Sequence, residues 1–230
     1  MWTRHSRLVL VSATLALPSI DGGAQSAELS ESRIYIEYNQ SANDLGYHVS
    51  LDGEDWTRLA IFSPIGRKTF EVEGRGAYKR LGMTELFFEG AEPSLDEFPL
   101  KELLALFPEG HYNFEGTTVE GEEIGGTGTL SHAVPNGPAE VRVVLSGDSL
   151  VISWAPVTTT PPGFPEKPIA IVAYQLIVDA FEVTVPHTVT SVTVSPEFVA
   201  SLPSGEVLFE VLAIDVSGNQ TISESSFVKP

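Results

Sequence analysis

Short alternating runs of apolar and polar residues fill the second half of this 230-residue chain. Each run is rich in β-branched or apolar residues and ends at a cluster of Gly, Pro or Ser, which is typical of strands closed by turns. The runs cover residues 139–147, 148–157, 169–179, 181–186, 190–196, 207–215 and 220–229. Seven short strands at this spacing predict an antiparallel β-sandwich.

The alternation also assigns an inward face to the predicted strands. Leu150, Ile152 and Trp154 fall on the same face of one strand, and we assign that face to the core. The odd-numbered residues from 207 to 213 form the inward face of another strand. Asp215 precedes a Ser-Gly-Asn turn, where we expect its carboxylate to accept backbone hydrogen bonds.

The first half contains further predicted strands and one helical interruption. These strands lie at 33–39, 46–62, 68–74, 84–90, 111–116 and 126–134. The run 46–62 contains Asp52-Gly53, which predicts a hairpin turn between two strands. Leu100–Leu106 is predicted to be helical, because Leu100, Leu103, Leu104 and Phe107 fall on one apolar stripe. The fold class is therefore mainly β, with two tandem β-sandwich-like domains, the first of which has one short helix.

Several landmarks of the second half resemble the fibronectin type III family. Trp154 ends a predicted strand and is followed by Ala-Pro, Tyr174 lies in the next strand, and residues 202–219 resemble the family's corner, sixth strand and final hairpin. The resemblance covers about residues 138–229 and implies an immunoglobulin-like sandwich. Val207 departs from it, because the family usually has a tyrosine at that corner. We assign the first half to no characterised family.

The ends and the middle of the chain predict its organisation. Arg4 and Arg7 precede a largely apolar run that ends in small and polar residues, which is typical of a secretory signal. A stretch with two prolines and an Asn-Gly marks a joint in the middle of the chain. The predicted units are a signal peptide at 1–26, a β-rich domain at 27–134, a linker at 135–138 and a fibronectin type III-like domain at 139–230. The expected location is secreted or extracellular, with a bacterial envelope as one such setting.

Charge and cysteine content narrow the classes of partner. The formal net charge is −18, and a chain this acidic repels nucleic acid and anionic membranes. We expect no membrane insertion after signal removal, because no later segment is long and apolar enough to span a bilayer. The chain has no Cys, which excludes disulfides and thiolate chemistry.

Motifs that would support catalysis are weak. Residues 147–150 spell GDSL, the nucleophile block of an esterase family, but no Asp-x-x-His follows to supply a base, and we interpret the segment as a turn. His48, His111, His132 and His187 stand apart in sequence and form no His-x-x-x-His pair. We expect His48 to face solvent, and we assign no catalytic residue.

Acidic residues around the predicted hairpin suggest a cation site. Asp44, Asp52 and Asp55 supply carboxylate oxygens, which are the ligands that Ca²⁺ prefers. Their spacing does not match an EF-hand loop, and a turn alone explains Asp52-Gly53. Calcium is therefore the candidate cofactor at these three residues, and no other cofactor is expected.

Aromatic residues of the first half suggest a binding surface. Trp56, Tyr47 and Tyr38 are the candidate binding residues, because exposed rings stack on sugars or anchor a protein partner. Trp56 lies next to the predicted turn and is expected to be the most exposed. The alternative is that these rings fill the core.

Together these patterns predict a secreted, non-enzymatic binding or structural protein that contacts an extracellular carbohydrate or a protein surface. Two alternatives stay open. The chain is an accessory module of an extracellular hydrolase, or a small hydrolase itself. In the second alternative, exposed edge strands pair so that the chain assembles with its own copies. The fold class does not choose among these functions.

Overall fold

A computed structural model describes residues 27–147 and 149–230. The predicted signal peptide at 1–26 and Asp148 of the GDSL stretch lie outside the described residues. The strands are β1 (Ala27–Glu28), β2 (Glu31–Asn39), β3 (Asp44–Phe62), β4 (Lys68–Glu73), β5 (Met83–Glu89), β6 (Gly110–Thr118), β7 (Glu123–Leu130), β8 (Arg142–Ser146), β9 (Ser149–Ser153), β10 (Ile171–Val178), β11 (Phe181–Pro186), β12 (Ser191–Val194), β13 (Gly205–Asp215) and β14 (Gln220–Lys229). The helices are α1 (Ala77–Leu81), α2 (Leu100–Leu106) and α3 (Pro196–Ser201).

The second half forms a sandwich of seven strands, as its alternation predicts. β12, β9 and β8 make one sheet, and β14, β13, β10 and β11 lie side by side in the other. Trp154 is buried between them, with its ring centroid 5.5 Å from that of Tyr174. The inward faces assigned from sequence are confirmed, because Leu150, Ile152 and the odd-numbered residues from 207 to 213 are all buried.

Asp215 has the turn role that the sequence predicts. Its Oδ2 accepts a hydrogen bond from the Ala170 backbone N–H at 2.6 Å, and its Oδ1 accepts one from the Ser217 N–H at 2.9 Å. The carboxylate is buried, so these bonds replace the water that it would otherwise bind. Asp215 therefore ties the β13–β14 turn to the start of β10.

The first half is organised by one long strand rather than by the predicted hairpin. β3 runs without a turn for 19 residues. Its first part pairs with β2 and β5, and the part from Trp56 onward pairs with β6 and, from Arg58, with β4. The hairpin predicted at Asp52-Gly53 is wrong. Gly53 is needed for close packing instead, because a Cβ there would lie 2.9 Å from Cδ2 of Leu29.

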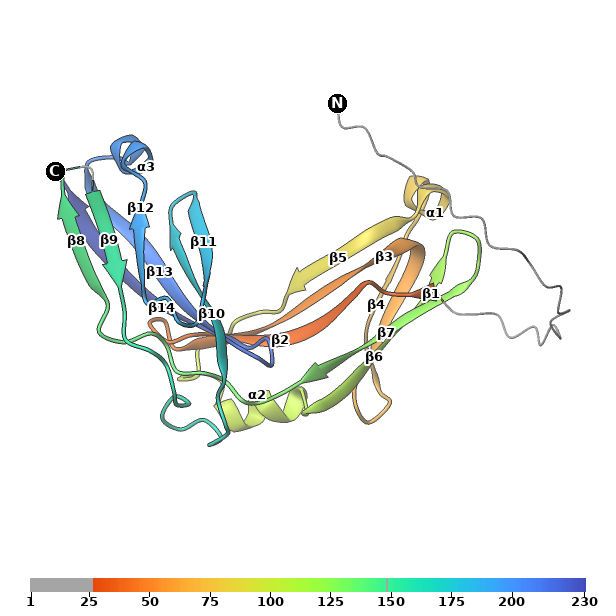
Figure 1. The fold of residues 1–230 in the computed structure, drawn as a ribbon. Helices are drawn as coiled ribbons and strands as arrows, with labels where there is room; N and C mark the ends of the chain where they lie inside the picture. The colour runs from red at the N-terminus through yellow and green to blue at the C-terminus, as the bar shows by residue number, and fades with distance from the viewer. Residues whose placement is uncertain (1–26, 148) are drawn as a thin grey trace, which may run out of the picture.

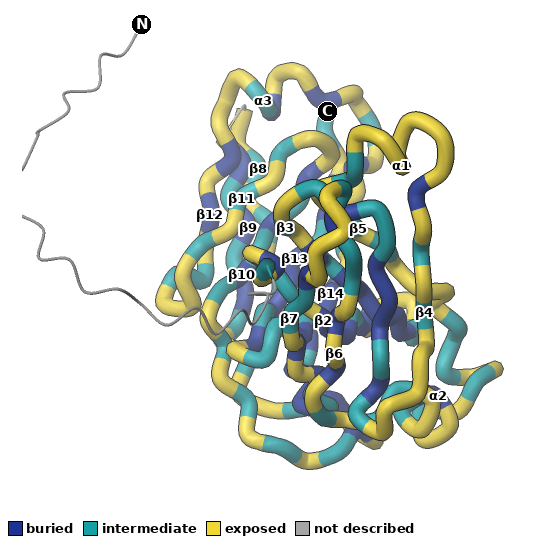
Figure 2. Tube along the Cα trace, turned by 90° about the vertical axis from the view of Figure 1, so that its right-hand side faces the viewer, coloured by how far each residue is buried: buried dark blue, intermediate teal, exposed yellow. Residues whose placement is uncertain are grey.

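The helices match the prediction in part. α2 begins at Leu100 and ends at Leu106, as the leucine stripe predicts, and it places Leu103 in the core. The structure adds α1, a five-residue helix with no buried residue. It also adds α3, where the Ser195 side chain accepts the Phe198 N–H and Pro196 begins the helix. Figure 2 shows α1 as a mostly exposed part of the surface.

The two halves share one sheet. β2 of the first half pairs in parallel with β14 of the second, so the strand order runs β1-β7-β6-β3-β2-β14-β13-β10-β11. Figure 1 shows β2 and β14 meeting where the halves join. The predicted linker is mostly buried, with Asn136 intermediate in exposure. The division into domains at 27–134 and 139–230 stays a prediction, because the larger sheet crosses it.

Candidate metal centre

Four chemically suitable side chains converge beside the junction of the halves. Glu37 comes from β2, His48 from β3, Glu89 from the end of β5, and Glu92 from the segment after β5. Strand pairing explains the convergence. His48 lies directly opposite Glu89 across β3 and β5, and Glu37 lies opposite Gly46, two residues before His48. Alternation therefore places the side chains of Glu37, His48 and Glu89 on the same face of the sheet.

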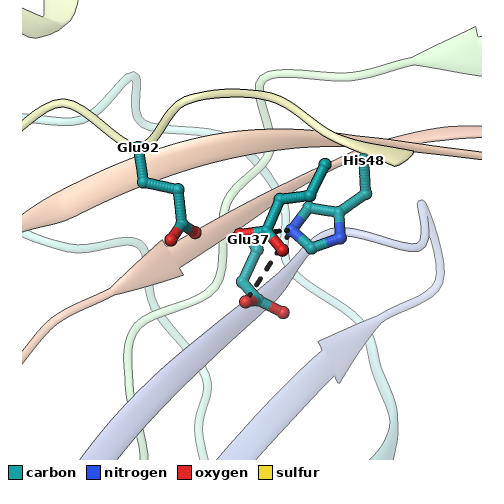
Figure 3. Close-up of side chains that lie close together, drawn as sticks. Glu37, His48 and Glu92 are labelled. Atoms are coloured by element: carbon teal, nitrogen blue, oxygen red, sulfur yellow. Dashed lines mark ion pairs between the residues drawn. The ribbon is translucent and has the colours of Figure 1, made fainter.

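The potential ligand atoms lie close together. One atom from each of the four side chains can be chosen so that all lie within 4.8 Å of one another. Nε2 of His48 is 3.7 Å from Oε1 of Glu37 and 3.9 Å from Oε1 of Glu89. Figure 3 shows the imidazole beside the Glu37 carboxylate, with Glu92 reaching down from the neighbouring segment.

His48 is buried without a hydrogen-bond partner. The residue is 5% exposed, and neither ring nitrogen has a hydrogen-bond partner among the described residues. Its ring stacks on Tyr35 at 4.9 Å between centroids and meets Phe87 at 5.9 Å. The aromatic neighbours thus hold the ring while Nε2 points toward carboxylates. The expectation that His48 faces solvent is wrong, because the rings of Tyr35 on β2 and Phe87 on β5 cover its imidazole.

A glycine makes room for Glu92. If Gly46 carried a Cβ, that atom would lie 2.8 Å from Cγ of Glu92 and 3.0 Å from its Oε1. The Glu92 side chain therefore lies directly over the backbone of β3, two residues before His48. A larger residue at position 46 would require the Glu92 side chain to shift.

The cluster concentrates negative charge. Partial desolvation, a hydrogen bond to Glu89 and the charges of Glu89, Asp44 and Glu37 together raise the pKa of Glu92 to about 7. Burial also raises the pKa of Asp44, with Glu224 and Glu89 adding to the effect. Burial and the neighbouring carboxylates both disfavour the charged forms of these acids, so a proton or a cation is favoured among them.

The raised pKa of Glu92 predicts that the stability of chelator-treated protein depends on pH. The folded pKa of Glu92 lies above its ordinary value of 4.5, so its protonated form stabilises the fold below about pH 4.5. That stability is lost as the pH rises through about 7. We subtract the melting temperature of Glu92→Gln from that of wild type at each pH. We expect this difference to be smaller at pH 7.5 than at pH 4.5. Glu37, Asp44, Glu89 and His48 face the group and stay present in both proteins. A difference in melting temperature that does not change with pH would contradict the raised pKa of Glu92.

The binding residues predicted from sequence are not on the surface. Trp56 is 0% exposed, and Tyr47 and Tyr38 are buried in the same core. The expectation that Trp56 is the most exposed of them is wrong, because β3 continues through the predicted turn and carries its ring inward. Buried rings offer no face to a sugar or a partner, which favours the core alternative.

The predicted calcium ligands do not meet. Asp44 and Asp52 lie eight residues apart in one strand, so a straight strand separates them by about 27 Å. Asp52 instead accepts hydrogen bonds from the Ser30 hydroxyl and the Gly53 N–H. Asp55 lies three residues beyond Asp52, farther from Asp44. The grouping of Asp44, Asp52 and Asp55 around one ion is therefore wrong, because it rested on the hairpin.

The sequence hides the observed cluster because its members come from three separate segments. Glu37 is separated from His48 by the end of β2, a turn and the start of β3, and Glu89 follows far along the chain. No local motif relates them, and only strand register brings them together. The sequence around His48 gave no signal, because Gly46, Ser50 and Asp52 share its strand face and suggest an exposed one.

The described residues contain no helix long and apolar enough to cross a membrane. No protein-family model and no curated protein matches the sequence.

Among solved structures, a two-domain fibronectin type III segment of chicken tenascin is 17% identical, with 89% of this chain and 98% of that chain covered and a TM-score of 0.29. Fibronectin(III)-like modules of Clostridium thermocellum CbhA are 10% identical, with 92% and 93% covered and a TM-score of 0.30. The spore cortex lytic enzyme SleM of Clostridium perfringens is 17% identical, with a TM-score of 0.34. That match covers 41% of this chain and 28% of SleM. With TM-scores this low, these structures do not indicate a function for this chain. Its own strands define its mainly β fold.

Proposed function

We propose that this chain is a non-enzymatic structural or binding module of an extracellular protein, and that its two halves act as one rigid unit. The observation that carries the proposal is the junction, where a shared sheet and a buried connection replace a flexible linker. A module built in this way holds its two ends in a fixed relation. Such a relation suits a spacer or a platform that presents a surface to a carbohydrate or protein partner.

Asn219 is the central side chain of the junction. It is 0% exposed, and its Oδ1 accepts the Ile36 backbone N–H of β2 at 2.8 Å. Its Nδ2 donates to the backbone oxygens of Ser131 at 2.8 Å and Ala133 at 3.0 Å. One side chain of the second half thus satisfies three backbone groups of the first half. Because Asn219 is buried, its Asn-Gln-Thr sequence cannot serve as a glycosylation site in the folded protein.

Further hydrogen bonds fix the connection itself. The Thr221 hydroxyl donates to the Pro135 carbonyl at 2.6 Å, and the Gly137 N–H donates to the Gln40 side chain at 2.8 Å. The Gln40 N–H in turn donates to the Ile222 carbonyl at 3.0 Å. These bonds hold residues around the predicted linker against β2 and β14, so the connection cannot act as a hinge without breaking them.

A loop of the second half also contacts the first half, in addition to the pairing of β2 with β14. Phe164, from the segment between β9 and β10, lies in the core cluster of the first half, and its ring centroid is 4.7 Å from that of Tyr38. Nearby in sequence, Lys167 donates to both carboxylate oxygens of Glu109 at 2.7 Å. Two contact regions resist bending more strongly than one, because a hinge motion would have to separate both.

The described residues form one small apolar cavity and several larger open hollows. The cavity, of about 140 Å³, lies in the first core and is lined mainly by aliphatic and aromatic side chains. Open hollows of about 430, 490 and 400 Å³ lie elsewhere on the surface, and Arg58, Glu115 and Glu123 line the one of about 490 Å³. The four side chains of the candidate metal centre line none of these four spaces. The proposed function therefore rests on the junction and not on the cavities.

Tryptophan fluorescence can test whether the halves unfold together. In residues 27–230, Trp56 lies in the first core and Trp154 in the second. The variants Trp56→Phe and Trp154→Phe therefore each leave one reporter, in opposite halves. We expect fluorescence and far-UV circular dichroism to give the same unfolding midpoint within each variant, as a single cooperative unit requires. Separate transitions for the two reporters would contradict the rigid unit.

A different experiment tests the two other claims of the proposed function, namely that the protein binds a partner and that it does not catalyse a reaction. Wild-type protein is applied to arrays of glycans, polymers and surface proteins, and is also incubated with the same compounds to detect cleavage. We expect binding without turnover. Light scattering across a series of protein concentrations tests the self-assembly alternative. If the chain assembles with its own copies, the average molar mass should rise with protein concentration. Cleavage of any arrayed compound would contradict the non-enzymatic function.

A further inference from the structure

We propose that Glu37, His48, Glu89 and Glu92 bind one divalent transition-metal cation of the zinc or manganese class. The proposal goes beyond the structural function above and does not depend on it. Two observations carry it. The first is the convergence of four ligand atoms within 4.8 Å of one another. The second is that the His48 imidazole is buried with no hydrogen-bond partner, although its Nε2 is directed at this group.

The distances suit a metal after small side-chain movements. Zinc binds imidazole nitrogen and carboxylate oxygen at about 2.0–2.2 Å, so neighbouring ligand atoms of a tetrahedral site lie about 3.4 Å apart. The observed separations from Nε2 of His48 are 3.7 Å to Glu37 and 3.9 Å to Glu89. These are too long for hydrogen bonds and close to the spacing around a shared ion. Glutamate side chains can close the remaining gap by rotation, while the His48 ring stays fixed by Tyr35.

The ligand types select the class of cation. Imidazole nitrogen suits zinc and its transition-metal neighbours, whereas Ca²⁺ and Mg²⁺ prefer all-oxygen sites. The carboxylates of Glu37, Glu89 and Glu92 carry up to three negative charges, and Asp44 adds to the local potential. A doubly charged cation offsets most of this charge. An exposed acidic patch would not by itself select a metal, but a buried imidazole at its centre supplies a ligand that prefers transition metals.

The bound cation would join elements of the sheet. Glu37, His48 and Glu89 lie on three adjacent strands, and Glu92 extends the set to the segment after β5. Glu37 also accepts a hydrogen bond from Gln220, which lies opposite it in β14 of the second half. A metal that fixes Glu37 would therefore stabilise a residue that contributes to the junction.

The test is a titration of chelator-treated protein with Zn²⁺, Mn²⁺ and Ca²⁺ in separate experiments, followed by calorimetry and thermal melting. We expect one equivalent of Zn²⁺ or Mn²⁺ to bind and to raise the melting temperature, with Ca²⁺ at least tenfold weaker. Co²⁺ gives a direct view of the ligands, because its visible absorption reports a low-coordinate site with a nitrogen ligand. Absence of saturable binding by Zn²⁺ and by Mn²⁺ would overturn the proposal.

Variants separate the site from general binding to an acidic surface. Glu92→Gln and His48→Gln are each expected to weaken the binding at least tenfold. The matched control is Glu85→Gln, which removes a carboxylate from the same face of β5 but outside the cluster, and it should bind as wild type does. Glu92 is exposed, so Glu92→Gln keeps the test valid if His48→Gln does not fold. Equal affinity of wild type and Glu92→Gln, or equal loss in Glu85→Gln, would overturn the site.

Discussion

Replacement of Asn219 by alanine is expected to lower the free energy of unfolding by about 3 kcal/mol or more. The change removes three hydrogen bonds and leaves the Ile36 N–H and two carbonyl groups without partners in the junction. Each unsatisfied buried group costs about 1–3 kcal/mol. Urea unfolding followed by circular dichroism and fluorescence measures the loss. Because the lost bonds join the halves, the variant is also expected to show separated transitions.

Two further variants serve as controls for Asn219→Ala. Asn113→Ala removes an exposed asparagine from β6, and its stability should stay within about 0.5 kcal/mol of wild type. Asn219→Asp keeps an acceptor for Ile36 but places a carboxylate against the carbonyls of Ser131 and Ala133, so it should not rescue stability. A wild-type midpoint for Asn219→Ala would show that this side chain does not hold the halves together.

Replacement of Trp56 by alanine is expected to cost about 3–5 kcal/mol, the range for removal of a fully buried aromatic side chain. Trp56 is 0% exposed and lies in the first core. Its Nε1 has no hydrogen-bond partner among the described residues, so the loss comes from packing and not from a hydrogen bond. Thermal and urea unfolding measure the effect, and Trp56→Phe, which keeps most of the apolar volume, should recover much of it.

Tyr78→Ala is the control for Trp56. Tyr78 lies on α1 and is largely exposed, so its removal should change the unfolding free energy by no more than about 0.5 kcal/mol. The comparison also decides between two roles for Trp56. If Trp56→Ala keeps wild-type stability and loses binding to a glycan, the ring acts at the surface and its assignment to the core is wrong.

The junction and the proposed metal centre share one residue. Glu37 is part of the cluster and accepts a hydrogen bond from Gln220 of β14. A rigid module and a metal site are separate proposals, and each has its own test. If both are correct, metal removal would loosen the same region that Asn219 holds, and the two effects on stability would not add, because the groups lie in one connected network.

The strand pattern of this protein follows from short-range sequence preferences. In the second half, alternation and turn residues predict the strands, the inward face of β9 and β13, and the role of Asp215. In the first half, the leucine stripe predicts α2. These features depend on residues that lie close together in the sequence, so the local sequence is enough to predict them.

Three errors of prediction arise from contacts between residues distant in sequence. Asp52-Gly53 is a strong local hairpin cue, yet β2 and β5 pair with β3 as far as Asp52, β5 and β6 pair with it again at Trp56, and β3 stays extended between these points. The long strand then buries Trp56 and separates Asp44 from Asp52. Extended pairing with three strands supplies more hydrogen bonds than one two-residue turn, so the tertiary context overrides the local preference.

The sequence by itself determined that this protein is acidic, free of disulfides and built mainly from strands, because composition and alternation need no knowledge of distant contacts. Only the tertiary structure decided that β2 pairs with β14, that Asn219 is a buried link, and that Glu37, His48, Glu89 and Glu92 meet. The physical reason is register. Which residues face each other across strands depends on pairings between segments far apart in the chain, and a shift of one residue would turn His48 to the opposite face.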